Sequence, residues 1–266
     1  MVWASGWEPP GQDGEGRIQE PRATTDRDGN PGRVRPLPTA SPRPGARRRR
    51  ALRALVLVPV MAVALMLALA LVYRAVTPPS TLMLGRWLSG QGATREAVPL
   101  EAIAPALVQG VIASEDQRFC AHGGVDWGAL RTVISDEDGP SRGASTVTMQ
   151  TAKNVFLWPG RSYLRKALEI PLALALDAVW GKRRTMEVYL NVAEWGEGIF
   201  GAEAAAWHWF GKPARDLSRG EAALLVAALP NPIARNPARP SRPLKALAER
   251  IQARMARLGG LAECVR

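Results

Sequence analysis

Several residue types are scarce in this chain of 266 residues. It holds two cysteines, two histidines and 24 acidic residues against 35 Lys and Arg. Cys120 and Cys264 lie far apart, and no His-Glu-x-x-His pattern joins His122 to His208, so we expect no zinc site. A Walker-type loop is also absent, which excludes the usual phosphate-binding loop of nucleotide hydrolases.

The two cysteines leave two alternatives open. An extracytoplasmic domain could join them as a disulfide. Two small buried thiols are the simpler expectation, because nothing in the spacing of Cys120 and Cys264 requires a bond. We assign them no function from the sequence.

Runs of alternating β-branched residues are missing as well, so the apolar residues indicate helices. Helix-like spacing recurs after residue 74, with breaks rich in Gly, Pro and Asp. The stretches are 101–115, 144–157, 162–180, 184–195, 199–210, 218–229 and 241–258. Ser218 and Glu221 form a capping box before an apolar run that Pro230 ends. We therefore predict one mainly α-helical domain over residues 74–266.

One glycine motif could mislead. Residues 196–201, Gly-Glu-Gly-Ile-Phe-Gly, match the glycine fingerprint of dinucleotide-binding folds. That fingerprint has to follow a strand, whereas residues 186–195 have a helical pattern. We interpret the motif as a tight connection between two helices.

The N-terminal part differs in composition from the rest. Residues 1–53 are crowded with Pro, Gly, Arg and Asp, and we expect a disordered tail that ends near Arg47–Arg50. Residues 54–73 are twenty consecutive residues without a charge, which is enough to span a bilayer. A cleaved signal peptide is the alternative, but its apolar region is usually shorter, at about 7–15 residues. We predict an uncleaved transmembrane helix.

The net charge of +11 indicates an anionic partner, either nucleic acid, anionic lipid or a phosphate-bearing substrate. The arginines before the span place the tail in the cytoplasm by the positive-inside rule. Residues 74–266 then lie outside, where nucleic acid is scarce. We therefore expect no nucleic-acid partner.

Three clusters could carry chemistry. Glu115 continues the apolar stripe of Val108, Val111 and Ile112, so it is either a general base or a structural partner of an arginine. In Gly143–Asn154, hydroxyls and amides beside Lys153 suit a phosphate or a sugar, although an ordinary helix cap explains them too. In Arg161–Glu169, several cations beside one carboxylate form either a surface ion pair or a diphosphate site.

Together these clusters resemble the family 51 glycosyltransferases of bacterial peptidoglycan synthesis, on their monofunctional biosynthetic branch. The matching segments are Glu115–Asp126, Gly143–Asn154, Arg161–Glu169, Tyr189–Asn191 with Ala204–Lys212, and Glu221–Pro232. The chain lacks the Ser-x-x-Lys and Lys-Thr-Gly pair of a penicillin-binding domain. The resemblance implies a mainly α, lysozyme-like glycosyltransferase domain with a cleft opening toward the membrane.

The resemblance also implies roles for individual residues. Glu115 would deprotonate the 4-hydroxyl of the acceptor sugar, which displaces the diphospholipid with inversion. Glu169 would position the leaving diphosphate, through a divalent cation (Mg²⁺ or Mn²⁺), and Lys153, Arg161 and Lys166 would neutralise its charge. The residues expected to shape the sugar sites are Asp116, Phe119, His122, Ser145, Thr146 and Gln150.

Two positions depart from the family pattern. Met149 stands where the family usually has the first glutamine of a pair, and Gly124-Val125 replaces a more common glycine-phenylalanine. Neither change touches Glu115 or Glu169, so we expect an active enzyme.

The implied substrate is lipid II, polymerised into glycan strands at the inner membrane by a periplasmic domain, with the N-terminus cytoplasmic. Other cell-wall synthesis and division proteins are expected partners. Two alternatives stay open: a lysozyme-like lytic transglycosylase, which cleaves strands, and an inactive cell-wall scaffold.

Overall fold

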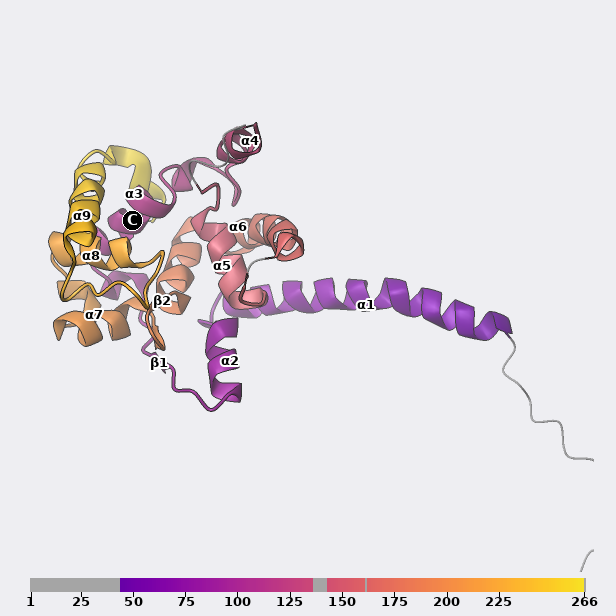
Figure 1. Ribbon diagram of the computed structural model, residues 1–266. Coiled ribbons are helices and arrows are strands. Elements are labelled where there is room, and N and C mark those ends of the chain that lie inside the picture. Colours follow the sequence, from indigo (N-terminus) through magenta and orange to yellow (C-terminus); the bar gives the residue numbers. More distant parts are fainter. Residues whose placement is uncertain (1–43, 136–142, 161, 266) are drawn as a thin grey trace, which may run out of the picture. The chain divides into compact units, whose positions relative to one another are not determined.

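The computed structural model describes residues 44–135, 143–160 and 162–265 (Figure 1). They fall into two units, one ending at Ala54 and one comprising Leu55–Arg266. The helices are α1 Pro44–Tyr73, α2 Thr81–Leu88, α3 Pro105–Glu115, α4 Trp127–Ser135, α5 Val147–Phe156, α6 Tyr163–Val192, α7 Ala202–Phe210, α8 Arg219–Ala228 and α9 Arg242–Met255. Among the described residues, 3-10 helices span Leu100–Ala102, Phe119–Ala121, Ala214–Asp216 and Gly259–Val265. The prediction of a mainly α-helical domain is confirmed.

Helix α1 contains the predicted span and begins earlier than expected. It starts at Pro44, so residues 44–53 are helical where the sequence predicts disorder; residues 1–43 lie outside the described part of the chain. The physical reason is that proline suits the first helical turn and arginine is a good helix former, so the apolar helix extends backward. Residues 48–73 are long and apolar enough to cross a membrane.

The C-terminal end of α1 is bonded to α6. The indole N–H of Trp180 donates to the carbonyl of Ala70 at 2.7 Å, and a guanidinium N–H of Arg184 donates to the carbonyl of Tyr73 at 2.9 Å. The carbonyl of Tyr73 is one that the helix end leaves free, whereas that of Ala70 also accepts the backbone N–H of Arg74 at 3.1 Å.

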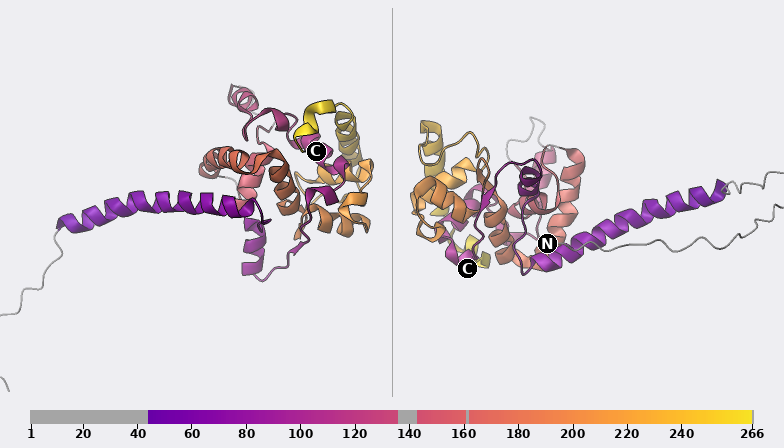
Figure 2. Two further views of the ribbon diagram at one scale, coloured as in Figure 1. Left: turned by 180° about the vertical axis from the view of Figure 1, so that it is seen from behind. Right: turned by 90° about the horizontal axis from the view of Figure 1, so that it is seen from below.

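The main core forms where α3 packs against α8 and α9. Figure 2 shows this grouping from two further sides, with yellow α9 and orange α8 beside magenta α3. Leu107, Val111 and Ile112 of α3 have no exposed surface, as the apolar stripe predicts. A second apolar cluster joins α2, α5 and α6, with α5 lying along α6. Helix α3 is therefore held in place by α8 and α9.

Helix α6 covers two predicted helices at once. The expected break between 180 and 184 is a kink at Gly181, whose φ of 68° is not helical. Helices α2 and α4 were not predicted, because stretches of 8 and 9 residues give too few turns for a clear period.

The glycine motif at 196–201 connects α6 to α7, as predicted, and it does so as part of a β-hairpin. Strands β2 Glu194–Gly196 and β3 Ile199–Phe200 pair antiparallel, and β1 Thr94–Arg95 pairs parallel with β3. Gly198 at the turn has a φ of 70°, which favours glycine. Strands of two or three residues carry no alternating pattern, so the sequence does not predict them.

The capping box of α8 is confirmed. The N–H of Glu221 donates to the hydroxyl of Ser218, and the N–H of Ser218 donates to the Glu221 carboxylate at 2.8 Å. The helix ends at Ala228, two residues before Pro230.

The expectation of two free thiols is wrong. Cys120 and Cys264 form a disulfide, with their Cα atoms 5.6 Å apart. The bond joins the turn that follows α3 to the C-terminal 3-10 turn. A sequence separation of 144 residues gives no local signal for such a bond.

Reducing this disulfide should destabilise the protein. A crosslink between distant residues removes unfolded-state entropy, so its loss is expected to lower the free energy of unfolding by about 2–5 kcal/mol. Chemical denaturation of the full chain in micelles, with and without reductant, measures this change. The double variant Cys120→Ser/Cys264→Ser is the control, and its free energy of unfolding should not change with reductant. Equal stability of the oxidised and reduced wild type would contradict the prediction.

Gly124→Ala should be strongly destabilising. Gly124 has a φ of 87°, and an added Cβ would lie 2.4 Å from the backbone oxygen of Ala173. Strain and clash together should cost at least about 2 kcal/mol. Gly123→Ala is the matched control, because its Cβ would meet nothing nearer than 3.9 Å. Similar melting temperatures for the two variants would show that α6 yields at this point.

Candidate active site

Glu115 is the last residue of α3 and lies between two cavities. Its apolar stripe is buried, whereas Glu115 itself is half-buried at the helix end. One cavity has a volume of about 520 Å³ and the other about 290 Å³, and Glu115 lines both. A carboxylate in this position can contact groups bound on either side.

Two side chains hold the carboxylate of Glu115. The hydroxyl of Ser114 donates to Oε1 at 3.1 Å, and Nε2 of Gln150 on α5 donates to Oε2 at 3.2 Å. The hydroxyl of Tyr189 on α6 donates in turn to Oε1 of Gln150 at 3.2 Å. Burial, together with the charges of Glu115 and Asp116, raises the pKa of Tyr189 well above its ordinary value. Tyr189 therefore stays a donor and fixes the amide orientation of Gln150.

Asp116 ties the end of α3 to the start of α5. Its side chain is buried, and Oδ2 accepts the backbone N–H of Val147 at 3.0 Å. Oδ1 lies 2.9 Å from Nε2 of His122. The sequence predicts sugar contacts for Asp116 and His122; here Asp116 lines the larger cavity, but its oxygens bond to the protein. His122 lines neither cavity.

Phe119 cannot contact a substrate. Its side chain has no exposed surface and lies in the main core, edge-on to the ring of His122. The Nζ of Lys182 lies 4.7 Å from its ring centre. The predicted sugar contact is corrected, because burial in the core leaves Phe119 only a packing role.

Thr146 is the cap of α5, as the alternative interpretation allowed. Its hydroxyl accepts the N–H of Met149 at 3.1 Å and donates to the carbonyl of Gly124 at 2.6 Å. Thr146 is buried but still lines the larger cavity, whereas Gln150 lines the smaller one. Its role is to hold the start of α5 against the loop at Gly124.

The two departures from the family pattern pack into one cluster. Val125 and Met149 are both buried with Ala173 of α6. A thioether at position 149 thus lies against a small aliphatic residue at position 125. The paired changes keep the cluster apolar and closed.

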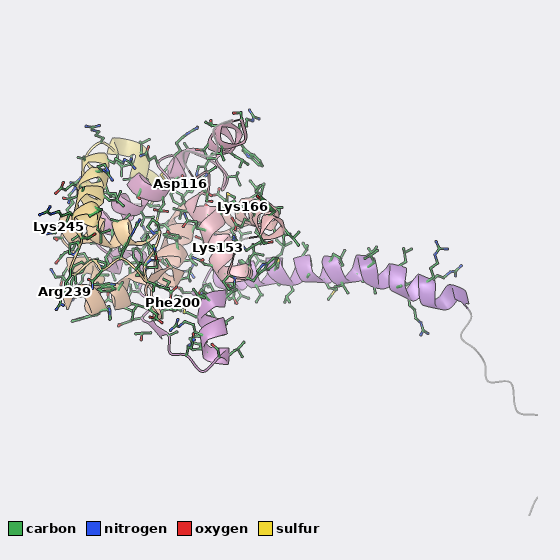
Figure 3. The ribbon with its side chains drawn as sticks, viewed as in Figure 1. Asp116, Lys153, Lys166, Phe200, Arg239 and Lys245 are labelled. Atoms are coloured by element: carbon green, nitrogen blue, oxygen red, sulfur yellow. A yellow bond between two sulfur atoms is a disulfide. The ribbon has the colours of Figure 1, made fainter. Side chains whose placement is uncertain are left out.

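A cationic group lies beside Glu115. It consists of Lys153 on α5 with Arg165 and Lys166 on α6; Figure 3 shows Lys153 and Lys166 on these neighbouring helices. The carboxylate of Glu169 is buried and accepts from Arg165 and, at 2.8 Å, from Lys166. Lys166 also donates to the hydroxyl of Ser145 at 2.7 Å. Three cations around one carboxylate leave a local excess of positive charge.

Lys153 is the member of this group that faces a cavity without a protein partner. It lines the smaller cavity, and within the described residues its ammonium makes no hydrogen bond or ion pair. Burial lowers the pKa of Lys153, and the charges of Arg165 and Lys166 add to this, against the opposite effect of Glu169 and Glu115. A bound anion would relieve this unfavourable environment.

Glu169 is poorly suited to holding a metal on its own. Both of its oxygens accept from cationic side chains, and no three His, Cys, Asp or Glu side chains gather elsewhere among the described residues. The donor set therefore does not fit a resident divalent cation, and we derive no step through one. Arg161, predicted to neutralise the diphosphate, lies outside the described residues.

Two supporting residues received no role from the sequence. Tyr189 opens the fourth matching segment, so its place in that segment was the available signal. Ser114, which precedes Glu115, has no such signal. Both act through Glu115, one directly and one through Gln150.

Comparisons with known proteins identify the family of this chain. The family model described as Transglycosylase matches residues 82–258. The biosynthetic peptidoglycan transglycosylase of Brucella suis is 51% identical over 224 residues, covering 84% of this chain and 99% of its own. That of Agrobacterium fabrum is 57% identical over 192 residues, covering 71% and 85%. That of Rhodospirillum centenum is 53% identical over 222 residues, covering 81% and 96%.

These matches confirm the resemblance carried by the five segments, and they extend it beyond the motifs to most of the domain. The matched range begins in α2 and ends just after α9, so it includes Glu115 and the cationic group. The chain belongs to the transglycosylase family.

Proposed function

We propose that this chain polymerises lipid II into β-1,4-linked glycan strands and releases undecaprenyl diphosphate. Its relatives carry the name biosynthetic peptidoglycan transglycosylase. The observation that carries the proposal is the position of Glu115, which lines two cavities, one of them also lined by Lys153. Two sugars and an anionic leaving group can be accommodated around this one carboxylate.

Glu115 is the proposed general base. It takes the proton of the acceptor 4-hydroxyl as that oxygen bonds to the anomeric carbon of the donor. The bond from that carbon to the diphosphate breaks on the opposite face, so the configuration inverts. Ser114 and Gln150 hold the two carboxylate oxygens, which keeps the base in a reactive orientation.

The cationic group stabilises the leaving diphosphate. Lys153 faces the smaller cavity and contacts the phosphate oxygens directly. Glu169 is a positioning residue, because it holds Arg165 and Lys166 beside the site without facing either cavity. Since the diphosphate leaves as an anion, it needs positive charge more than a proton.

The lytic alternative fits this arrangement less well. A glycosidase needs an acid to protonate the glycosidic oxygen, but it has no use for cations that receive a diphosphate. An inactive scaffold would have no need for the hydrogen bonds from Tyr189 through Gln150 to Glu115.

We also propose that α1 anchors the chain in the inner membrane, with the N-terminus cytoplasmic and the catalytic domain periplasmic. The span over residues 48–73 and the arginines at its N-terminal end support this orientation. The Cys120–Cys264 disulfide is independent support, because such bonds persist in oxidising compartments. The membrane and the lipid substrate are then partners, and other cell-wall synthesis and division proteins remain proposed ones.

Glu115→Gln should abolish polymerisation. The amide cannot accept the proton, so the rate should fall by about 10²–10⁴-fold while the melting temperature stays the same. Gel separation of glycan strands made from purified lipid II measures the product. Glu249→Gln, on the exposed side of α9, is the matched control. Unchanged activity of Glu115→Gln would refute the assignment of Glu115 as the base. Shortened sacculi without new polymer would favour lytic cleavage. The same assay of the wild type with a chelator tests the predicted divalent cation.

Lys153 should set the alkaline limit of activity. Its lowered pKa means that it loses its charge at a lower pH than an exposed lysine, so kcat/KM should decline there. Lys153→Arg stays charged and should shift this decline to higher pH, even if the maximal rate is lower. Lys245→Arg is the control on an exposed position. If kcat/KM declined at the same alkaline pH in Lys153→Arg and in Lys245→Arg, the decline would have to be assigned to a group other than Lys153.

A further inference from the structure

A third cavity continues from the site. This side cavity has a volume of about 240 Å³ and is lined by Ala113, Gln117, Arg254, Arg257, Leu258 and Leu261. Gln117 and Arg254 also line the larger cavity beside Glu115. Arg254, near the end of α9, therefore lies where a ligand in the larger cavity could extend into the side cavity.

The positive charge of the side cavity is not neutralised. Within the part of the chain that the structure describes, neither the Arg254 nor the Arg257 guanidinium has a hydrogen bond or an ion pair, and no carboxylate lines this cavity. The larger cavity differs, because Arg118 there lies 3.4 Å from Asp126 and the Asp116 carboxylate is paired with His122. The two arginines can thus receive an anion from the ligand.

The remaining walls are apolar. Ala113 and Leu258 are buried, and Leu261 is 49% exposed. A guanidinium binds a carboxylate through two parallel hydrogen bonds, and the leucines suit small aliphatic groups. The chemistry favours a short peptide with a free carboxylate. A volume below about 300 Å³ admits one or two residues of it, since pockets for whole drug-sized ligands are larger.

We propose that the side cavity binds the carboxylate-bearing peptide on the substrate sugar, with Arg254 as its main contact. The proposal rests on the proposed function, because peptidoglycan precursors carry such a peptide on the sugar that is joined to the diphosphate. The diphosphate itself is received by Lys153, which lines the cavity on the far side of Glu115. Arg254 therefore selects for the peptide and takes no part in the bond changes.

The test compares two substrates with the full chain in micelles: lipid II with its peptide, and the same lipid-linked disaccharide without it. Arg254→Gln should raise KM about tenfold more for the peptide-bearing substrate than for the peptide-free one, which corresponds to the loss of one hydrogen-bonded ion pair. Lys245→Gln removes one charge from the opposite face of α9, on the outer side in Figure 3, and should change neither KM.

Three outcomes would overturn the proposal. Equal KM values of the wild type for both substrates would mean that no peptide is bound. An equal rise for both substrates in Arg254→Gln would assign the residue to the sugar or the diphosphate. Calorimetric titration of both substrates measures binding without turnover. If the wild type forms no polymer, the proposed function fails, but a preference for the peptide-bearing substrate that Arg254→Gln abolishes would still support the side cavity. Equal affinities of the wild type for both substrates would refute the proposal.

Discussion

The site depends on the hydrogen bonds of the buried Asp116 carboxylate. A buried charge must be compensated, and here the start of α5 and the ring of His122 supply the partners. Because Asp116 directly follows Glu115, its bond to Val147 holds Glu115 against α5, the helix that carries both Gln150 and Lys153. Replacing His122 would leave the buried carboxylate without its side-chain partner, which costs more than the bond itself contributes.

The sequence predicts the helices well where period and caps are local. The stripe along α3 and the capping box of α8 are examples, since each depends on residues within four positions of one another. Pairing between distant residues was not predictable, as the disulfide and the parallel pairing of β1 with β3 illustrate. A strand of two residues has no period, and a bond between cysteines depends on a fold that has already formed.

For the site, the resemblance named segments that meet around Glu115, but it did not indicate which of their residues are buried. Phe119 lies in the core and Thr146 caps α5 at the wall of the larger cavity, and such positions depend on tertiary packing that a motif does not encode. Arg254 shows the reverse case, because it belongs to no segment and reaches the cavity only through the packing of α9 on α3. Charge and spacing identify groups of residues that are close in the sequence, and they miss residues that only the fold brings close together.

The disulfide also orders events in time. It fastens the turn after the base to the C-terminal 3-10 turn, so the chain must be made and delivered through Cys264 before that turn is secured. For an anchored enzyme whose domain lies outside the membrane, the crosslink could not form while any of that stretch remained in the reducing cytoplasm. On the proposed topology, the turn after Glu115 would be crosslinked only outside the membrane, where we propose that lipid II is used.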